Sequence, residues 1–113
     1  MTTIYHNPRC SKSRQTLALL EEAGITPTVV RYLESPLSRE QLADLIERSG
    51  RPVSDFFRAG EAQAKAQGLT VKSAPEALLD SIAAEPKLME RPIVVTDKGV
   101  ALGRPPERVR EIL

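Results

Sequence analysis

The chain contains very few of the residues that bind metals or form disulfides. Its 113 residues include one cysteine, one histidine and no tryptophan. A single cysteine excludes an internal disulfide, and one cysteine with one histidine supplies too few soft ligands for a structural zinc site. We therefore expect no metal centre.

Charge of one sign and long apolar runs are also lacking. The chain has 16 Lys plus Arg against 15 Asp plus Glu, a formal net charge of +1, which creates no broad field for nucleic acid or an anionic bilayer. No stretch approaches the roughly 18 apolar residues of a spanning helix, and the N-terminus lacks the pattern of a secretory signal. We expect a cytoplasmic protein without nucleic-acid or membrane partners, in which any anion site is local.

The first third of the chain predicts a β-α-β unit. Residues 2–5 are β-prone and end before Asn7-Pro8, residues 11–23 have apolar side chains at helical spacing, and residues 26–33 are rich in β-branched residues. Consecutive strands joined by a helix are parallel with a right-handed crossover. Cys10 therefore falls at the N-terminus of the first helix.

The middle of the chain is expected to be mostly helical. Ser38 with Gln41, and Ser73 with Glu76, have the spacing of a capping box at a helix N-terminus. Between these two helices, residues 53–68 predict one or two further short helices.

The last part of the chain predicts a hairpin followed by a helix. The runs "IVVT" and "VAL" flank the turn "DKG", which is typical of antiparallel strands. Pro105-Pro106 can begin a final helix with Val109, Ile112 and Leu113 facing inward.

The order of elements predicts an α/β protein. A β-α-β unit, a helical segment and a β-β-α unit form the thioredoxin-like fold with a four-stranded mixed sheet. We interpret residues 1–113 as a single domain of this type with a helical insertion at about residues 38–86.

The position of Cys10 favours a reactive thiol. Helix N-termini present a positive dipole end and free N–H groups that stabilise a thiolate. The Ser13 hydroxyl could add a hydrogen bond, and Arg9, Lys12 and Arg14 raise the local positive potential. We expect the thiol pKa to fall from about 8.5 by one unit or more.

His6 is the second candidate in the opening motif. It lies four residues before Cys10 and could support the thiolate as imidazolium or orient a proton donor for a leaving oxygen. Taken alone, the residues also allow a buried, unreactive cysteine and a structural histidine.

Spacing excludes two common cysteine motifs. A phosphatase-type loop needs arginine six residues after the cysteine, but position 16 is Thr. A disulfide oxidoreductase motif needs a second cysteine at position 13, which is Ser. The chain therefore has one thiol to use, and any second thiol comes from outside.

Over essentially its whole length the chain resembles the glutaredoxin-coupled arsenate reductase (ArsC) family, which has a thioredoxin-like fold. Five segments carry the resemblance: "IYHNPRCSKSR", "YLESPLSREQL", "FFRAGE", "RPIVVTDKG" and "LGRPPE". The resemblance implies that Cys10 is the nucleophile with His6 beside it, and that Arg58, Arg91 and Arg104 bind the substrate oxyanion. It also implies a cis bond between Arg91 and Pro92.

The activity implied by the resemblance is glutathione- and glutaredoxin-dependent reduction of arsenate to arsenite, as in arsenical resistance. Cys10 would form a covalent adduct with arsenate or a similar oxyanion. Glutathione would be a co-substrate, glutaredoxin a partner, and no cofactor would be bound. Outside the matching positions, the other arginines are expected to be solvated surface cations: Arg31, Arg39, Arg48, Arg51, Arg108 and Arg110.

Two alternatives stay open. One is a thiol-dependent oxidoreductase of the same family that acts on a substrate other than arsenate. The other is a regulator of the Spx type, which shares the fold and binds RNA polymerase. Such regulators commonly have Cys-x-x-Cys, so Ser13 argues against their usual redox switch.

Overall fold

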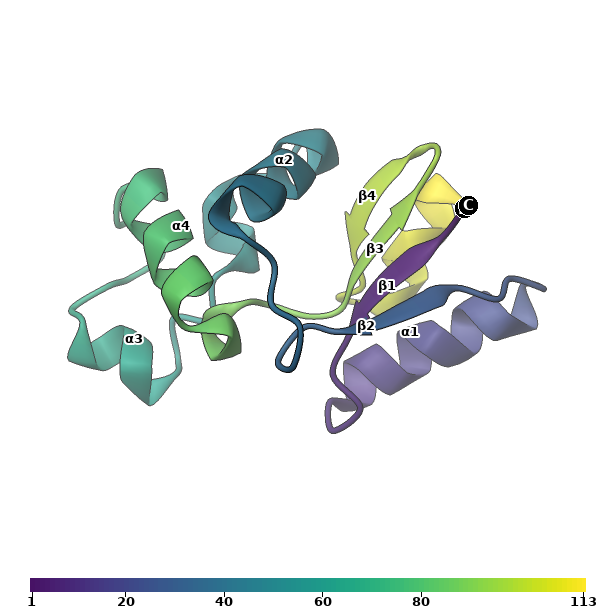
Figure 1. Cartoon of the computed structure of the whole chain (residues 1–113), viewed down its shortest axis with the longest axis horizontal. Helices are drawn as coiled ribbons and strands as arrows, with labels where there is room; N and C mark the ends of the chain where they lie inside the picture. The colour runs from purple at the N-terminus through teal and green to yellow at the C-terminus, as the bar shows by residue number, and fades with distance from the viewer. The chain divides into compact units, whose positions relative to one another are not determined.

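Four short strands form one mixed sheet in the computed structural model of the protein, which describes residues 1–113. The strands are β1 (Thr3–His6), β2 (Thr28–Arg31), β3 (Ile93–Thr96) and β4 (Gly99–Leu102), in the order β2-β1-β3-β4. β1 pairs in parallel with β2 and antiparallel with β3, and β3 pairs antiparallel with β4 (Figure 1). The predicted four-stranded mixed sheet is confirmed.

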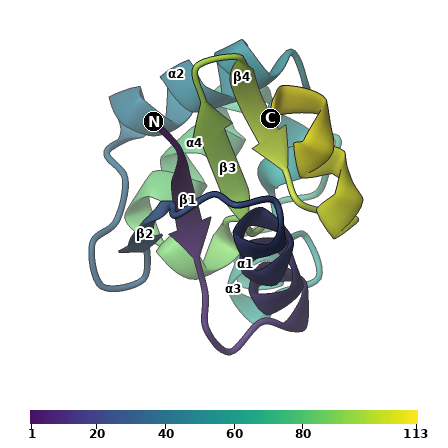
Figure 2. The ribbon, with the colours of Figure 1, turned by 90° about the vertical axis from the view of Figure 1, so that its right-hand side faces the viewer.

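Helix α1 (Ser11–Glu22) makes the crossover from β1 to β2. It ends before Gly24, whose φ of +80° is in the left-handed region that glycine adopts without strain. Leu20 of this helix packs into a core cluster with Ile4 and Val94 of the sheet. Figure 2 shows α1 and the C-terminal helix on the same side of the sheet.

The final helix is a 3-10 helix, η3 (Pro106–Ile112), rather than an α-helix. Its buried residues are Pro106, Val109 and Ile112, a spacing of three that matches the three residues per turn of a 3-10 helix. Val109 and Ile112 belong to the core cluster, and Leu113 packs against it. The inward positions were therefore predicted correctly, although the type of helix was not specified.

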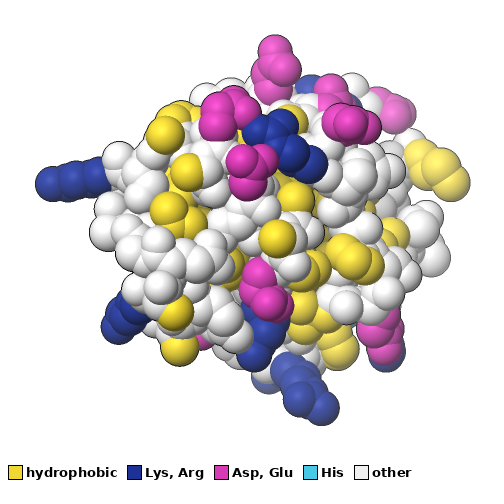
Figure 3. Space-filling model, turned by 60° about the vertical axis from the view of Figure 1, so that its left-hand side comes forward, with side chains coloured by type: hydrophobic (Ala, Val, Ile, Leu, Met, Phe, Trp, Pro, Cys, Tyr) yellow, Lys and Arg dark blue, Asp and Glu magenta, His cyan; other side chains and the backbone are white.

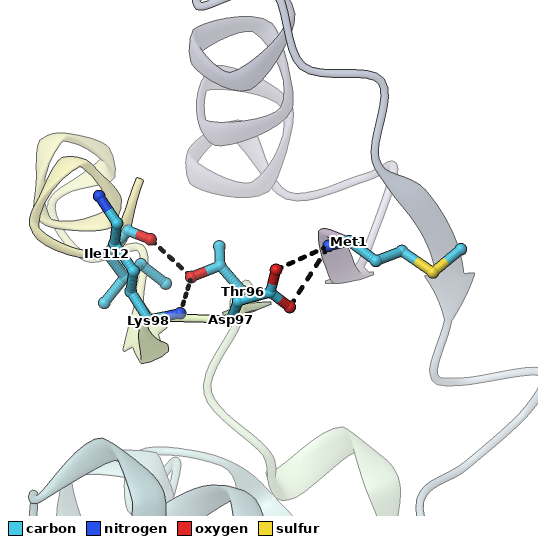
Figure 4. Close-up of polar contacts among 5 residues, drawn as sticks. All are labelled: Met1, Thr96, Asp97, Lys98 and Ile112. Carbon is cyan, nitrogen blue, oxygen red and sulfur yellow. Dashed lines mark hydrogen bonds and ion pairs between the residues drawn. The ribbon is translucent and has the colours of Figure 1, made fainter.

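Hydrogen bonds connect η3 to the turn between β3 and β4. The Thr96 hydroxyl donates to the Ile112 carbonyl oxygen at 2.5 Å and accepts from the Lys98 backbone N–H at 3.1 Å. Asp97, next in the turn, accepts from the Met1 ammonium at 3.4 Å (Figure 4). These contacts fasten the end of the sheet away from Cys10.

Helices predominate in the segment between β2 and β3. It contains α2 (Arg39–Ser49), η1 (Val53–Phe56), α3 (Ala62–Ala66), α4 (Pro75–Ala84) and η2 (Pro86–Leu88). The chain divides into two compact units, Met1–Ser35 with Arg91–Leu113, and Pro36–Glu90. The helical insertion expected at about residues 38–86 lies within the second unit, while its status as part of a single domain stays a prediction.

Helix α2 begins as the sequence predicts. Ser38 is its N-cap, the Ser38 hydroxyl oxygen accepts from the Gln41 N–H at 3.1 Å, and the Gln41 side chain accepts from the Ser38 N–H at 3.0 Å. These two reciprocal bonds satisfy donors that the first turn leaves free. The capping box is confirmed.

The capping box predicted at Ser73 is wrong. The N-cap of α4 is Ala74, and the Ser73 hydroxyl oxygen accepts instead from the Thr70 N–H at 2.9 Å. Pro75 begins the helix, because a proline has no N–H to leave unsatisfied at that position. Glu76 is thereby free to form an ion pair with Arg39.

Helices α2 and α4 pack together through apolar side chains and a surface ion-pair group. The buried side chains are Leu42, Leu45 and Ile46 of α2 and Leu78, Leu79 and Ile82 of α4. Arg39 pairs with both Glu76 and Asp80. On the face shown in Figure 3, acidic and basic side chains are interspersed. No helix of the protein combines the length and the apolarity that crossing a bilayer requires.

Candidate active site

Cys10 is the N-cap residue of α1, as predicted. Its backbone is extended, with φ −93° and ψ 123°, and no side chain caps the first turn. The first turn also contains no acidic residue that would compensate the positive end of the helix. Because the free N–H groups of a helix start attract an anion, this position favours a thiolate at Cys10.

The surroundings of the Cys10 sulfur lower its pKa. Burial raises the pKa of the thiol, since only 8% of the residue is exposed. The backbone N–H of Ser13, the charge of Arg91, the backbone N–H of Lys12 and the charge of Arg104 act in the opposite direction, and together they bring the pKa below its ordinary value. Cys10 is therefore a buried residue whose polar neighbours favour the ionised form.

The guanidinium of Arg104 lies beside the sulfur. Its Nη1 is 4.0 Å from Cys10 Sγ and donates to the Arg91 carbonyl oxygen at 3.2 Å. The peptide bond between Arg91 and Pro92 is cis, as predicted, and so is the bond between Arg104 and Pro105. The carbonyl of Arg91 thus holds the Arg104 guanidinium in a fixed position near the thiol.

Gly103 brings the end of β4 against α1. Its N–H donates to the Pro92 carbonyl oxygen at 2.9 Å. A Cβ atom at this position would lie 2.7 Å from Thr16 Oγ1 and 2.9 Å from Pro92 Cγ. Sequence reasoning did not single out Gly103, because nothing local in the chain shows that another element approaches it so closely.

The Ser13 hydroxyl binds His6 rather than Cys10. Ser13 Oγ is 2.6 Å from His6 Nδ1 and accepts from the Asn7 N–H at 3.1 Å. Ser13 contributes its backbone N–H, not its hydroxyl, to the lowering of the thiol pKa. The predicted thiolate-stabilising role of Ser13 therefore falls to a different group of the same residue.

His6 is buried, and its environment favours the neutral ring. Burial, followed by the charges of Arg31 and Arg14, lowers the pKa of His6. This direction argues against the imidazolium that we expected to support the thiolate. The ring instead holds Ser13, and with it the first turn of α1, through the bond at Nδ1.

The Arg14 guanidinium binds a backbone carbonyl, whereas we expected it to support the thiolate. Its Nη1 donates to the Pro8 carbonyl oxygen at 2.9 Å, and its charge lowers the pKa of His6. The charges that lower the thiol pKa are those of Arg91 and Arg104. A cation close to Cys10 in sequence is thus directed away from the sulfur, because α1 turns its side chain outward.

Arg58 belongs to the other compact unit, Pro36–Glu90. It pairs with Glu61 at 2.7 Å and with Glu90 at 3.8 Å, and its Nη1 donates to the Lys87 carbonyl oxygen at 3.1 Å. These contacts hold the guanidinium within its own unit. Its predicted contact with the oxyanion stays a prediction.

The described geometry supplies a nucleophile and an anion site without a metal. No group of three or more His, Cys, Asp or Glu side chains lies where it could bind a metal ion. A thiolate beside two guanidiniums can attack an electrophile that carries negative oxygens and neutralise their charge during the attack.

Comparison with known proteins places the chain in a family. The sequence model of the ArsC family matches residues 5–112. The chain belongs to the ArsC family. This ArsC-family chain is 48% identical over 112 residues to the uncharacterized protein YfgD of Escherichia coli K12, covering 97% of the chain and 94% of that protein.

Other relatives of this ArsC-family protein are named for an activity. It is 45% identical over 112 residues to the arsenate reductase of Rhizobium meliloti, covering 98% of this chain and 80% of that one. The solved structure of the arsenate reductase from Vibrio cholerae has a TM-score of 0.92 at 47% identity, covering 99% and 97% of the two chains. The predicted thioredoxin-like fold is confirmed.

Proposed function

We propose that the protein is an arsenate reductase. The observation that carries the proposal is the Cys10 thiol, whose pKa is lowered at the start of α1 with Arg104 Nη1 4.0 Å away. Relatives that carry the name arsenate reductase are 42–47% identical in sequence, among them those of Rhizobium meliloti and Vibrio cholerae. A thiolate with guanidinium neighbours suits an anionic electrophile such as arsenate.

In the first step the Cys10 thiolate attacks the arsenic(V) of dihydrogen arsenate. A bond forms between Cys10 Sγ and arsenic, an As–O bond breaks, and the leaving oxygen takes protons and departs as water. No electrons change hands in this step, so arsenic stays pentavalent. Arg91 and Arg104 would stabilise the negative charge on the oxygens that remain, and Arg58 is a third candidate for this role.

The reduction needs two external thiols, because the chain has only Cys10. Glutathione attacks the arsenic of the adduct and displaces a second water, which leaves sulfur from Cys10 and from glutathione on arsenic. A glutaredoxin thiolate then attacks the glutathione sulfur. The As–S electron pair stays on arsenic, which becomes trivalent, and glutaredoxin leaves as the mixed disulfide. Water releases arsenite from Cys10.

This scheme requires no bound cofactor, since the electrons come from thiols. The proposed reductants place the reaction in the cytoplasm, where thiols are kept reduced. His6 and Ser13 would act as positioning residues, because their hydrogen bond joins the end of β1 to the first turn of α1.

Arsenate-dependent oxidation of NADPH, coupled through glutathione reductase, glutathione and glutaredoxin, tests the proposal. We expect turnover with the wild-type protein and none with Cys10→Ser, which keeps a side chain of similar size. Rapid labelling of Cys10 by iodoacetamide at pH 6 without arsenate turnover would instead indicate a thiol-dependent reductase for another substrate. Slow labelling and no turnover would reject both enzymatic functions.

A further inference from the structure

A cavity of about 260 Å³ lies beside the residues that lead into Cys10. It is lined by residues 6–9 and by Arg31, Leu33 and Glu34. These segments follow the parallel strands β1 and β2, whose carboxyl ends meet at one edge of the sheet. Ligands of open α/β sheets bind at that edge. The volume of the cavity is close to the lower limit of small-molecule pockets, which is about 300 Å³.

The charged groups of the cavity have no partners within the protein. Arg9, Arg31 and Glu34 are exposed, and none of their side chains forms an ion pair. The cavity therefore presents two free positive charges and one free negative charge. A small molecule with two carboxylates and one ammonium group would match these three charges.

The remaining wall of the cavity is apolar. Leu33 is 45% exposed, which makes it one of the few large exposed hydrophobic side chains of the protein, and Pro8 lies in the opposite segment. Aliphatic and ring surfaces of this kind can cover the methylene groups of a peptide-like ligand. The cavity thus combines ionic groups with a short apolar surface.

The loop that forms one wall ends at the thiol. The Cys10 N–H donates to the Asn7 carbonyl oxygen at 3.0 Å, so residues 7–10 make a tight turn. His6, another residue of the cavity wall, is hydrogen-bonded through its Nδ1 to Ser13 Oγ in the first turn of α1 at 2.6 Å. The residues that form this wall of the cavity therefore lead directly into the reacting cysteine.

We propose that this cavity binds the thiol co-substrate, a small zwitterionic peptide thiol of the class to which glutathione belongs. The inference rests on the proposed function, because only that reaction requires an external thiol. Arg9 and Arg31 would bind the two carboxylates, and Glu34 the ammonium group. The ligand's sulfur would then attack arsenic on Cys10 and expel water, as in the second step above. Because the three charges are exposed and screened, binding is weak.

Binding can be measured without the reaction. S-methylglutathione has the charges of glutathione but no free thiol, so it cannot react with Cys10 or arsenic. In a titration of the ¹⁵N-labelled wild-type protein, we expect saturable shifts in the amides of residues 6, 7, 9 and 31–34; Pro8 has no N–H. Shifts confined to other residues, or equal shifts with inorganic phosphate, would reject the cavity as a thiol site.

Two matched variants test the charges. Arg31→Ala and Arg110→Ala remove the same charge, but Arg110 is an exposed residue of η3 that does not line the cavity. We expect Arg31→Ala to weaken S-methylglutathione binding about five-fold or more, and Arg110→Ala to change it by less than two-fold. Equal effects of the two variants would contradict the proposal.

The kinetic constants of Arg31→Ala distinguish the role of the cavity from the proposed arsenate reductase activity. If the cavity is the thiol site, Arg31→Ala raises the KM for glutathione more than the KM for arsenate. An unchanged KM for glutathione in an enzyme that still reduces arsenate would reject only the cavity. If arsenate is not reduced at all, the proposed function fails, and binding of S-methylglutathione still reports on the cavity.

Discussion

Gly103 and Thr16 approach each other so closely that a Cβ atom on Gly103 would lie 2.7 Å from Thr16 Oγ1. Thr16 is fully buried on α1, and its hydroxyl donates to the Lys12 carbonyl oxygen at 2.8 Å. Gly103 is joined directly to Arg104, whose guanidinium faces Cys10. A side chain at position 103 would therefore push the residue next to Arg104 away from α1, the helix that begins beside Cys10.

Gly103→Ala tests this positioning role. We expect a loss of about 1–3 kcal/mol in the free energy of unfolding, because the added methyl group overpacks the contact. Displacement of Arg104 should also raise the pKa of Cys10, measured from the pH dependence of iodoacetamide labelling. In the double variant Gly103→Ala with Thr16→Ala the contact with Thr16 is relieved, while the one with Pro92 Cγ at 2.9 Å stays. The thiol pKa should therefore return part of the way towards the wild-type value. If Gly103→Ala is destabilised but its thiol pKa is unchanged, Gly103 has only a structural role.

Arg91 and Arg104 should act on both the thiol and the substrate. Their charges lower the pKa of Cys10, so Arg91→Ala and Arg104→Ala should each raise it in the labelling experiment. If the same groups stabilise the oxyanion, each substitution should cost about 2–4 kcal/mol in transition-state stabilisation, measured as kcat/KM for arsenate. Arg110→Ala is the control for loss of charge. Unchanged kinetics in both variants would mean that the oxyanion is held elsewhere.

The stability of the protein should fall in mild acid because of His6. Burial, Arg31 and Arg14 lower the pKa of His6 in the folded state, so below about pH 6.5 the unfolded chain binds a proton that the folded chain does not. Unfolding should therefore become easier as the pH falls from the unfolded pKa towards the folded one. Urea unfolding between pH 7 and pH 5 measures the slope. His6→Gln should flatten it, and an equally steep slope in that variant would assign the effect to other groups.

Cys10 should contribute a second dependence on pH, at higher values. Its folded pKa is below the ordinary value, so between the folded and unfolded pKa values the unfolded chain binds the extra proton. Stability from this group is present above the unfolded pKa and is lost as the pH falls through the folded pKa. Comparison of urea unfolding in wild type and Cys10→Ser across this window should isolate the contribution. Parallel curves would show that the thiol pKa is the same in both states.

Two serines with the same spacing should respond differently to substitution. Ser38→Ala removes a true capping box and should cost about 1 kcal/mol in the free energy of unfolding. Ser73 is not the N-cap of α4, so Ser73→Ala should cost less. Urea unfolding of the two variants under identical conditions makes the comparison. A larger loss in Ser73→Ala would contradict the assigned start of α4.

Much of the fold follows from local patterns that the sequence displays directly. The β-branched runs, the spacing of apolar residues and the glycine after α1 predicted all four strands, and helices α1, α2 and α4, to within a few residues. Ser73 shows the limit of such reasoning. The spacing of Ser73 and Glu76 is that of a capping box, but Pro75 starts the helix one residue later, and Glu76 pairs with Arg39 of α2.

The candidate site was predictable in its residues but not in its contacts. Cys10 could be placed at the start of a helix because strand, turn and helix follow one another in the chain. Ser13 illustrates what the sequence could not show: its hydroxyl binds His6, and its backbone N–H supports the thiol. Arg14 is near Cys10 in sequence but bonds to Pro8, whereas Arg104, distant in sequence, faces the sulfur.

The sequence by itself determined the strands, the principal helices and the position of the one thiol, since these depend on residue spacing along a continuous stretch of chain. Tertiary structure alone decided which cations act on Cys10 and why position 103 requires a residue without a side chain. It also decided that Arg31 and Glu34 line a cavity beside the reactive loop. Electrostatic and steric interactions depend on distance through space, and folding brings together side chains such as those of Cys10 and Arg104, which are 94 positions apart in the chain.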